Sequence, residues 1–304
     1  MKKLIFLSLF SLGCLLSLSA QEFISLWPEG QMPDSKGMDL AFEEENQRIT
    51  QVAEPGMYAF FTSMEEYTGS AVLICPPGGY AKLTYQVAGF QFAKWLNTIG
   101  IDAFVLIHRL PTSPDLVERE KGPVQDAQRA MKILRANAAE WNLDPDKIGI
   151  MGASAGGHLA SLMGTLDEDF SAIGDPLDDV SFTPGFMILV SPVISMGEFC
   201  HTGSRDNLLG PDPGADKIEK YSSQLHVSSN TPPAFIVLAE NDPVVHPMNS
   251  ILFYQALMEN DVPASLHIFP DGQHSIALRN NPGSTQLWTD LCEEWLMTLL
   301  EGGE

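Results

Sequence analysis

Ile-Gly-Ile-Met-Gly-Ala-Ser-Ala-Gly-Gly-His-Leu-Ala-Ser-Leu-Met-Gly occupies residues 148–164, and this stretch decides the fold. A short apolar run at 148–151 predicts a β-strand, and small residues at 158–166 predict a helix. Between them lies Gly152-Ala-Ser-Ala-Gly156, the G-x-S-x-G pattern of a nucleophile elbow. Such a turn holds Ser154 in a strained conformation above the sheet, and the helix that follows points its N-terminus at the place where an oxyanion forms. An ordinary glycine-rich turn is the alternative interpretation.

The rest of the chain alternates apolar runs with amphipathic stretches. The apolar runs predict strands over residues 57–61, 70–75, 101–107, 185–191, 234–239 and 264–269. The stretches with helical periodicity predict helices over residues 87–99, 122–141, 247–260 and 284–300. This alternation predicts an α/β fold with a doubly wound, mostly parallel sheet.

Two segments fall outside this alternation. Residues 21–55 are rich in Pro, Gly and acidic residues, and we expect them to pack across the surface through Leu26-Trp27-Pro28. Residues 195–233 hold Gly, Pro, Asp and Ser, with one short helical candidate at 215–221. An insertion at this point would sit above the carboxyl ends of the strands, where ligands bind in open α/β sheets. We therefore expect a small lid or substrate wall.

The first twenty residues are similar to a secretory signal peptide. Lys2-Lys3 precede an apolar run from Leu4 to Leu18, and Ala20 stands where a signal peptidase would cleave. We therefore expect residues 21–304 to form one exported domain, secreted or periplasmic. The alternatives are an uncleaved membrane anchor and a lipoprotein that carries its lipid on Cys14.

Composition narrows the choice of partners. The chain carries 39 Asp and Glu against 17 Lys and Arg, a formal net charge of −22. Nucleic acid and anionic membranes repel so acidic a protein, and we expect neither as a partner. The sequence has no Cys/His cluster with zinc spacing and no phosphate-binding glycine loop, so we expect neither a metal nor a cofactor. Cys75 and Cys292 fall in predicted core elements and are expected to be buried thiols.

A serine needs a base to take its proton, and the base needs a carboxylate to fix its tautomer. In this type of fold the chain order is serine, acid, histidine. Ser154, Asp242 and His274 occur in that order, and the last two each follow a predicted strand. The parallel arrangement therefore predicts that all three gather at one edge of the sheet. Glu240 and Asp271 are the rival acids.

The other histidines have weaker positions. His246 is the main rival as the base because it lies close to Asp242 in the chain. His158, one turn into the helix, is expected to pack beneath the site. His201 and His226 lie in the insertion and are candidates to line a pocket.

The predicted strand 70–75 ends in Pro76-Pro-Gly-Gly-Tyr80. In this type of fold the loop at that point supplies an N–H group to an oxyanion hole. Pro77 has no N–H group to give, so Gly78 and Gly79 are the candidate donors. An ordinary Pro-Gly turn is the alternative. Tyr80 and His246 are candidate substrate-binding residues.

Several of these strings together resemble one family. They are Cys75-Pro-Pro-Gly-Gly-Tyr80, Asp126-Ala-Gln-Arg-Ala130, Gly152-Ala-Ser-Ala-Gly-Gly-His-Leu-Ala160, Asp242-Pro-Val-Val245 and Asp271-Gly-Gln-His274. The resemblance is to bacterial acetylxylan esterase-like α/β-hydrolases, including the bifunctional acetylxylan/feruloyl esterases of Bacteroidetes. It implies that Ser154 is the nucleophile, His274 the base and Asp242 the orienting acid, with N–H donors from Gly79 and Ala155. The family usually has three glycines before the tyrosine, and Pro77 departs from that pattern.

The resemblance also implies a function, a secreted serine esterase that removes acetyl groups from plant polysaccharide. One alternative is a feruloyl esterase or another short-chain carboxylesterase of the same fold. A second is a non-catalytic sugar-binding protein that uses Trp27, Tyr80, Trp95 and the insertion as a platform. Members of this family are often called xylanases, but glycoside hydrolysis needs a pair of opposed carboxylates, to which nothing in this sequence points.

Overall fold

The computed structural model describes residues 22–274 and 276–301. The predicted signal peptide, with Cys14, lies outside these residues. Within the described ranges, none of the helices combines the length and the apolar character needed to cross a membrane.

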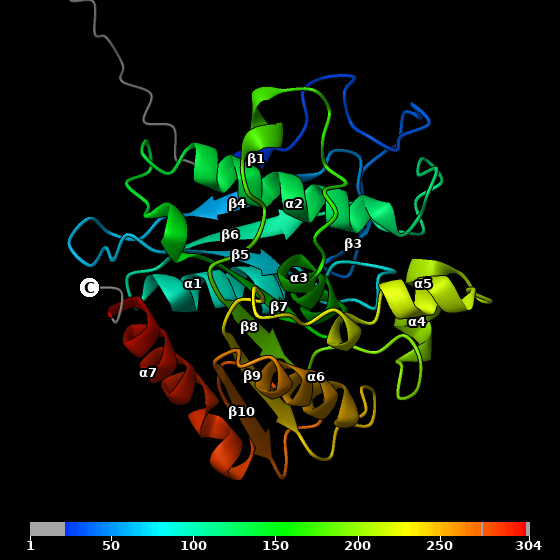
Figure 1. The fold of residues 1–304 in the computed structure, drawn as a ribbon. Helices are drawn as coiled ribbons and strands as arrows, with labels where there is room; N and C mark the ends of the chain where they lie inside the picture. The colour runs from blue at the N-terminus through cyan, green and yellow to red at the C-terminus, as the bar shows by residue number, and fades with distance from the viewer. Residues whose placement is uncertain (1–21, 275, 302–304) are drawn as a thin grey trace, which may run out of the picture.

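One twisted sheet runs through the protein (Figure 1). Its strand order is β1-β4-β6-β5-β7-β8-β9-β10. The strands are β1 (Phe23–Ser25), β4 (Gly56–Phe60), β5 (Ala71–Cys75), β6 (Asp102–Ile107), β7 (Ile148–Ala153), β8 (Met187–Val190), β9 (Ala234–Ala239) and β10 (Ala264–Phe269). Only the β1–β4 and β4–β6 pairs of this sheet are antiparallel. The predicted α/β class with a mostly parallel sheet is confirmed.

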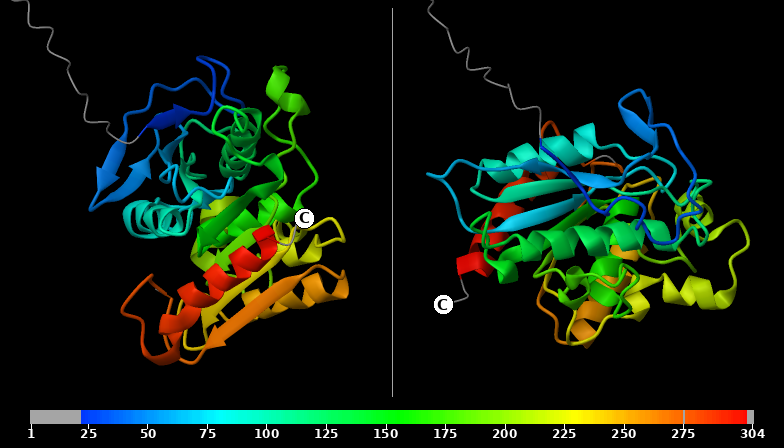
Figure 2. Two further views of the ribbon diagram at one scale, coloured as in Figure 1. Left: turned by 90° about the vertical axis from the view of Figure 1, so that its left-hand side faces the viewer. Right: turned by 90° about the horizontal axis from the view of Figure 1, so that it is seen from above.

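Helices cover both faces of the sheet, which gives two apolar cores (Figure 2). One core holds α2 (Lys121–Ala136), α3 (Ala155–Thr165) and α6 (Met248–Glu259). The other holds α1 (Gln91–Asn97) and α7 (Trp288–Glu301). Strands β5, β6 and β9 are buried along their whole length because both of their faces are covered.

The helix predicted over 87–99 is divided. A π-helical turn occupies Gln86–Phe90, and α1 follows it. Ala88 has non-helical dihedral angles within this turn. A Cβ atom on Gly89 would come 2.8 Å from Cγ1 of Val105, so only glycine lets the turn approach β6 this closely.

Two other segments contain structure that the hydrophobic pattern did not predict. Residues 22–55, called the leader below, form β1 and a separate hairpin of β2 (Glu43–Glu45) and β3 (Arg48–Gln51). The insertion contains α4 (Thr202–Leu209) as well as the predicted short helix, α5 (Ala215–Lys220). Each of these elements is short and most of them are polar, so none carries a clear apolar period.

Buried charges hold the leader against the domain. The indole N–H of Trp27 and the guanidinium of Arg109 both donate to Asp126, at 2.8 and 2.9 Å. Nε of Arg129 donates to the backbone carbonyl of Leu26 at 3.0 Å. The expected packing through Leu26 and Trp27 is thus present, and it rests on hydrogen bonds to buried charged side chains as well as on apolar contact.

Candidate active site

The turn between β7 and α3 is strained at one residue, Ser154, which has φ 54° and ψ −122°. A Cβ atom on Gly152 would lie 2.1 Å from the carbonyl oxygen of Gly156. A Cβ atom on Gly156 would lie 2.0 Å from the carbonyl oxygen of Cys75. Both glycines of the G-x-S-x-G pattern are therefore needed for the backbone to make the turn.

The structure brings the three predicted residues together. Oγ of Ser154 lies 2.8 Å from Nε2 of His274, and Nδ1 of His274 lies 2.7 Å from Oδ2 of Asp242. With the proton on Nδ1, the imidazole donates to the carboxylate and accepts from the serine hydroxyl. This is the arrangement in which a histidine can act as a general base toward a serine.

Asp242 follows β9 and is held as an anion. Burial alone would raise the pKa of this carboxyl group, but hydrogen bonds from His274, Val245 and Val244 outweigh burial and lower the pKa. The two backbone N–H groups donate to Oδ1 at 3.0 and 2.8 Å and leave Oδ2 to the imidazole. The carboxylate is thereby fixed in charge and direction.

The rival base His246 and the rival acid Asp271 bond to other groups. His246 is exposed, accepts the N–H of Met248 and packs its ring on Phe199. It does not line the pocket around Ser154, so its predicted role in substrate binding has no support from its position. The carboxylate of Asp271 accepts from Asn241 at 3.1 Å.

The loop after β5 turns its peptide N–H groups outward. The carbonyl of Pro77 accepts the N–H of Thr84 at 2.7 Å, and the carbonyl of Gly78 accepts the N–H of Ala81 at 3.1 Å. In a trans peptide the N–H points opposite to the C=O, so the N–H groups of Gly78 and Gly79 point away from the loop interior. Both glycines line the same pocket as Ser154.

A third N–H group belongs to Ala155. The carbonyl of Ser154 accepts the N–H groups of His158 and Val193, at 3.1 and 3.0 Å. The N–H of Ala155, in the same peptide group, points the opposite way, out of the N-terminus of α3. A first-turn N–H has no partner within its own helix and is free to bind an anion.

A pocket of about 460 Å³ lies at this edge of the sheet. Apart from Ser154, His274 and the loop residues 77–79, its lining is Arg48, Thr84, Val87, Ala88, Gln91, Phe92, Ala153, Val190, His201, Val244, Ile276, Ala277 and Leu278. Most of these side chains are apolar, and among the described residues that line it there is no Asp or Glu. The wall residues were not predicted, apart from His201, because they come from several strands, helices and loops with no shared pattern.

The predicted role of Tyr80 is corrected by the structure. Its side chain is only 2% exposed, and its hydroxyl lies 2.7 Å from Nδ1 of His158. The left-handed backbone at Tyr80, with φ 62°, turns the ring down into the core instead of into the pocket. His158 packs beneath the site as predicted, where burial lowers its pKa to about 4.

The insertion 195–233 is hydrogen-bonded both to the loop after β5 and to helix α3. Nδ2 of Asn207 donates to the carbonyl of Gly79 at 2.8 Å. Nε2 of His158 donates to the carbonyl of Tyr221 at 2.7 Å. His201 brings the insertion into the pocket, whereas His226 is bonded within the insertion to the carbonyl of Glu219. The insertion therefore contributes His201 to the lining of the pocket.

A mostly parallel sheet with a strained serine at a strand–helix turn, and with an acid and a histidine following it in the chain, defines the α/β-hydrolase class. The sequence pattern of the BD-FAE family matches residues 116–257. An acetyl ester-xyloside bifunctional hydrolase from Caldicellulosiruptor lactoaceticus is 35% identical with a TM-score of 0.77, over 92% of this chain and 96% of that one. The chain belongs to the family of acetylxylan esterase-like α/β-hydrolases, which are carboxylic ester hydrolases.

Two curated relatives are longer proteins. The acetylxylan esterase of Xylanibacter ruminicola is 38% identical over 215 residues, which are 69% of this chain and 42% of the relative. The endo-1,4-beta-xylanase B of Butyrivibrio fibrisolvens is 32% identical over 227 residues, which are 75% of this chain and 35% of the relative. The chain thus spans less than half the length of these curated relatives.

Proposed function

We propose that the chain hydrolyses carboxylic esters through an acyl-enzyme, with Ser154 as nucleophile, His274 as base and Asp242 as the acid that orients it. The observation that carries this proposal is the pair of contacts at His274, 2.8 Å to the serine oxygen and 2.7 Å to the carboxylate. A hydrogen-bonded nucleophile and base, with a third group that fixes the base, is the geometry that nucleophilic catalysis needs.

The reaction follows from these contacts. Nε2 of His274 removes the hydroxyl proton as Oγ of Ser154 forms a bond to the ester carbonyl carbon. The N–H groups of Gly78, Gly79 and Ala155 stabilise the charge on the carbonyl oxygen. The ester C–O bond breaks, and the imidazolium gives its proton to the leaving alcohol oxygen. Water then attacks the acyl-serine by the same route, and the carboxylic acid leaves.

The proposed substrate is an acetyl ester on a plant polysaccharide such as xylan. The names of the relatives from Xylanibacter and Caldicellulosiruptor support it, since both refer to acetyl esters of xylan or xylosides. The absence of Asp and Glu among the described lining residues supports an esterase over a glycosidase, because glycosidases need a carboxylate on each side of the bond.

A second candidate is an ester with a larger acyl group. The pocket of about 460 Å³ is much larger than an acetyl methyl group requires, and Val87, Phe92 and Leu278 give it an apolar lining. This observation favours feruloyl or other short-chain carboxylesters as additional substrates. Rates on 4-nitrophenyl acetate, butyrate and methyl ferulate would separate the two candidates.

The experiment that tests the proposal measures acetate release from acetylated xylan by wild type and Ser154→Ala, with 4-nitrophenyl acetate as the control substrate. Release by wild type alone supports both mechanism and substrate class. Activity on the small ester alone keeps the triad and rejects the polymer. No activity on either, with no labelling of Ser154 by a fluorophosphonate probe, would favour a non-catalytic sugar-binding protein.

We further propose that residues 1–20 direct export and that residues 21–304 form one catalytic domain. The basic and apolar residues of the first segment support export. Intact mass of the protein recovered from the periplasm or medium of an expressing cell tests this. A protein that starts at Gln21 agrees with it, whereas a lipid mass on Cys14 contradicts it.

A further inference from the structure

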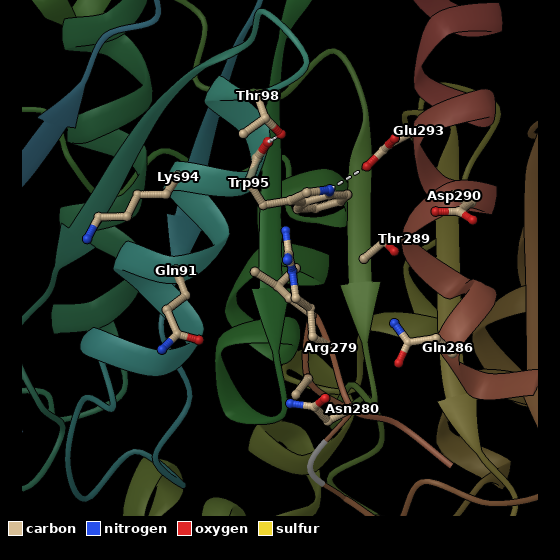
Figure 3. Close-up of a pocket in the computed structure, with 12 residues that line it drawn as sticks. Gln91, Lys94, Trp95, Thr98, Arg279, Asn280, Gln286, Thr289, Asp290 and Glu293 are labelled. Atoms are coloured by element: carbon tan, nitrogen blue, oxygen red, sulfur yellow. Dashed lines mark hydrogen bonds between the residues drawn. The ribbon is translucent and has the colours of Figure 1, made fainter. Parts of the chain in front are cut away.

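A second hollow, of about 820 Å³, lies between α1 and α7 on one face of the sheet (Figure 3). We call it the α1–α7 groove. Its lining residues are Gln91, Lys94, Trp95, Thr98, Ala277, Leu278, Arg279, Asn280, Gln286, Thr289, Asp290 and Glu293. Its volume falls within the roughly 300–1,000 Å³ that ligand sites occupy, and none of these residues takes part in the proposed chemistry.

The groove adjoins the active-site pocket. Gln91, Ala277 and Leu278 line both hollows. Residue 276 lines the pocket, and residues 279 and 280 line the groove, so the segment 276–280 borders both hollows. A ligand bound in the groove would therefore lie next to the pocket that holds Ser154.

One aromatic ring in the groove is held rigidly. The indole N–H of Trp95 donates to Oε1 of Glu293 at 2.6 Å, which bridges α1 and α7. The ring also packs against the buried Trp288, with centroids 5.4 Å apart. In Figure 3 the side chain of Arg279 reaches toward this partly buried ring. An ordered indole with planar polar groups around it presents both an apolar face and hydrogen-bonding atoms.

We propose that the α1–α7 groove binds sugar residues of the polysaccharide main chain, beyond the residue that carries the ester. This rests on the proposed function, since it deepens the substrate of the same site. Amide, carboxylate and guanidinium groups together supply donors and acceptors for hydroxyl groups, and the indole supplies an apolar surface for a ring face. Lys94, Arg279, Asp290 and Glu293 all line the groove, so it carries charges of both signs and suits a neutral polyol better than an ion.

The test uses the exposed pair Arg279→Ala/Asp290→Ala, with Glu294→Ala as the matched control. Glu294 is an exposed acid on α7 that does not line the groove. The readout is the ratio of kcat/KM on acetylated xylan to kcat/KM on 4-nitrophenyl acetate. We expect the ratio to fall about tenfold in the pair, which corresponds to about 1.4 kcal/mol of lost binding, and to stay at the wild-type value in the control. An unchanged ratio in the pair would overturn the proposal.

A binding measurement separates this proposal from the proposed function. Calorimetry of Ser154→Ala with unacetylated xylohexaose needs no turnover. We expect binding that weakens about tenfold when Arg279→Ala/Asp290→Ala is added. Binding of this kind without acetate release from xylan would reject the proposed substrate and keep the groove. Acetate release without xylohexaose binding, or binding that the pair does not change, would reject the groove and keep the esterase.

Discussion

The hydroxyl of Tyr80 donates a hydrogen bond to Nδ1 of His158 at 2.7 Å, and this bond joins the loop that follows β5 to the helix that follows Ser154. The contact of the other ring nitrogen, Nε2, shows which atom of this bond is the donor and which is the acceptor. Nε2 of His158 faces the carbonyl of Tyr221, which only accepts, so Nε2 carries the proton and Nδ1 is the acceptor. Three segments that surround the nucleophile therefore meet at one neutral imidazole.

Tyr80→Phe removes the only donor that the structure records for Nδ1 of His158. A buried acceptor left without its partner costs about 1–3 kcal/mol, so we expect the free energy of unfolding to fall by that amount in urea. His158→Leu/Tyr80→Phe, which removes both partners, should be less destabilised than the sum of the two single variants. Strict additivity would show that the bond contributes nothing.

His158 also predicts how stability depends on pH. Burial lowers its pKa to about 4 in the folded state, against 6.5 for the unperturbed side chain. As pH falls, the unfolded state takes up the proton before the folded state does. The free energy of unfolding is therefore highest above pH 6.5 and decreases as pH falls toward 4, by up to roughly 3 kcal/mol. Urea midpoints between pH 7.5 and 4.5 measure it. His158→Gln should flatten this part of the profile, and an equally steep profile in the variant would contradict the assignment.

Asp102 should give stability the opposite dependence on pH. Burial raises its pKa to about 6, against the effect of the Thr62 N–H, which donates to the carboxylate at 2.7 Å. The folded state therefore resists ionisation, and stability falls as pH rises from about 4 through 6. Asp102→Asn keeps an acceptor for Thr62 without the charge. We expect it to raise the unfolding free energy by about 1–3 kcal/mol at pH 8 and to have little effect at pH 4. Equal effects at both pH values would argue against a buried charge.

Gly78 tests the loop that is proposed to bind the oxyanion. Its φ is 150°, and a Cβ atom would come 1.9 Å from the carbonyl oxygen of Lys82. Gly78→Ala must shift the donors, and we expect kcat on 4-nitrophenyl acetate to fall about 10²–10³-fold. Gly174→Ala is the control because Gly174 also has a positive φ, 84°, but has open space around it. Equal activity losses in the two variants would mean that backbone strain alone is responsible.

Asp242→Asn keeps the size of the side chain and removes its charge. The amide can present an N–H where the imidazole needs an acceptor, which favours the wrong histidine tautomer. We expect kcat to fall about 10³–10⁴-fold with an almost unchanged far-ultraviolet circular dichroism spectrum. Asp271→Asn, on the neighbouring loop, is the matched control and should keep wild-type kcat. A small loss in Asp242→Asn would move the orienting role to another group.

The fold was predictable for strands that are covered on both faces and for helices with a regular spacing of apolar residues. The runs 70–75, 101–107 and 234–239 are almost wholly apolar, and each forms a strand within one residue of the predicted bounds. The predicted pattern did not extend to α4, which is eight residues long and partly exposed. The hydrophobic pattern also did not predict that the polar face of α2 is buried. Its basic side chains form ion pairs with Asp169 and Asp175, and Arg129 also donates to the carbonyl of Leu26 in the leader.

The candidate site was predictable because the carboxyl ends of parallel strands lie at the same edge of the sheet. Ser154, Asp242 and His274 each follow a strand, and they lie within hydrogen-bonding distance. The direction of a side chain in a loop depends on backbone angles that residue type does not reveal. Tyr80 has a left-handed backbone and points into the core, and His246 stacks on Phe199 outside the pocket.

The hydrogen bonds that reach the carbonyl groups of Gly79 and Tyr221 limit how this protein can be re-engineered. Because of these bonds, residues 195–233 cannot be exchanged independently of the rest of the domain. A replacement segment from a relative would have to present an amide where Asn207 stands and a main-chain acceptor opposite His158. Exchange of this segment therefore has to preserve Tyr80 and His158 or replace both of them together with it.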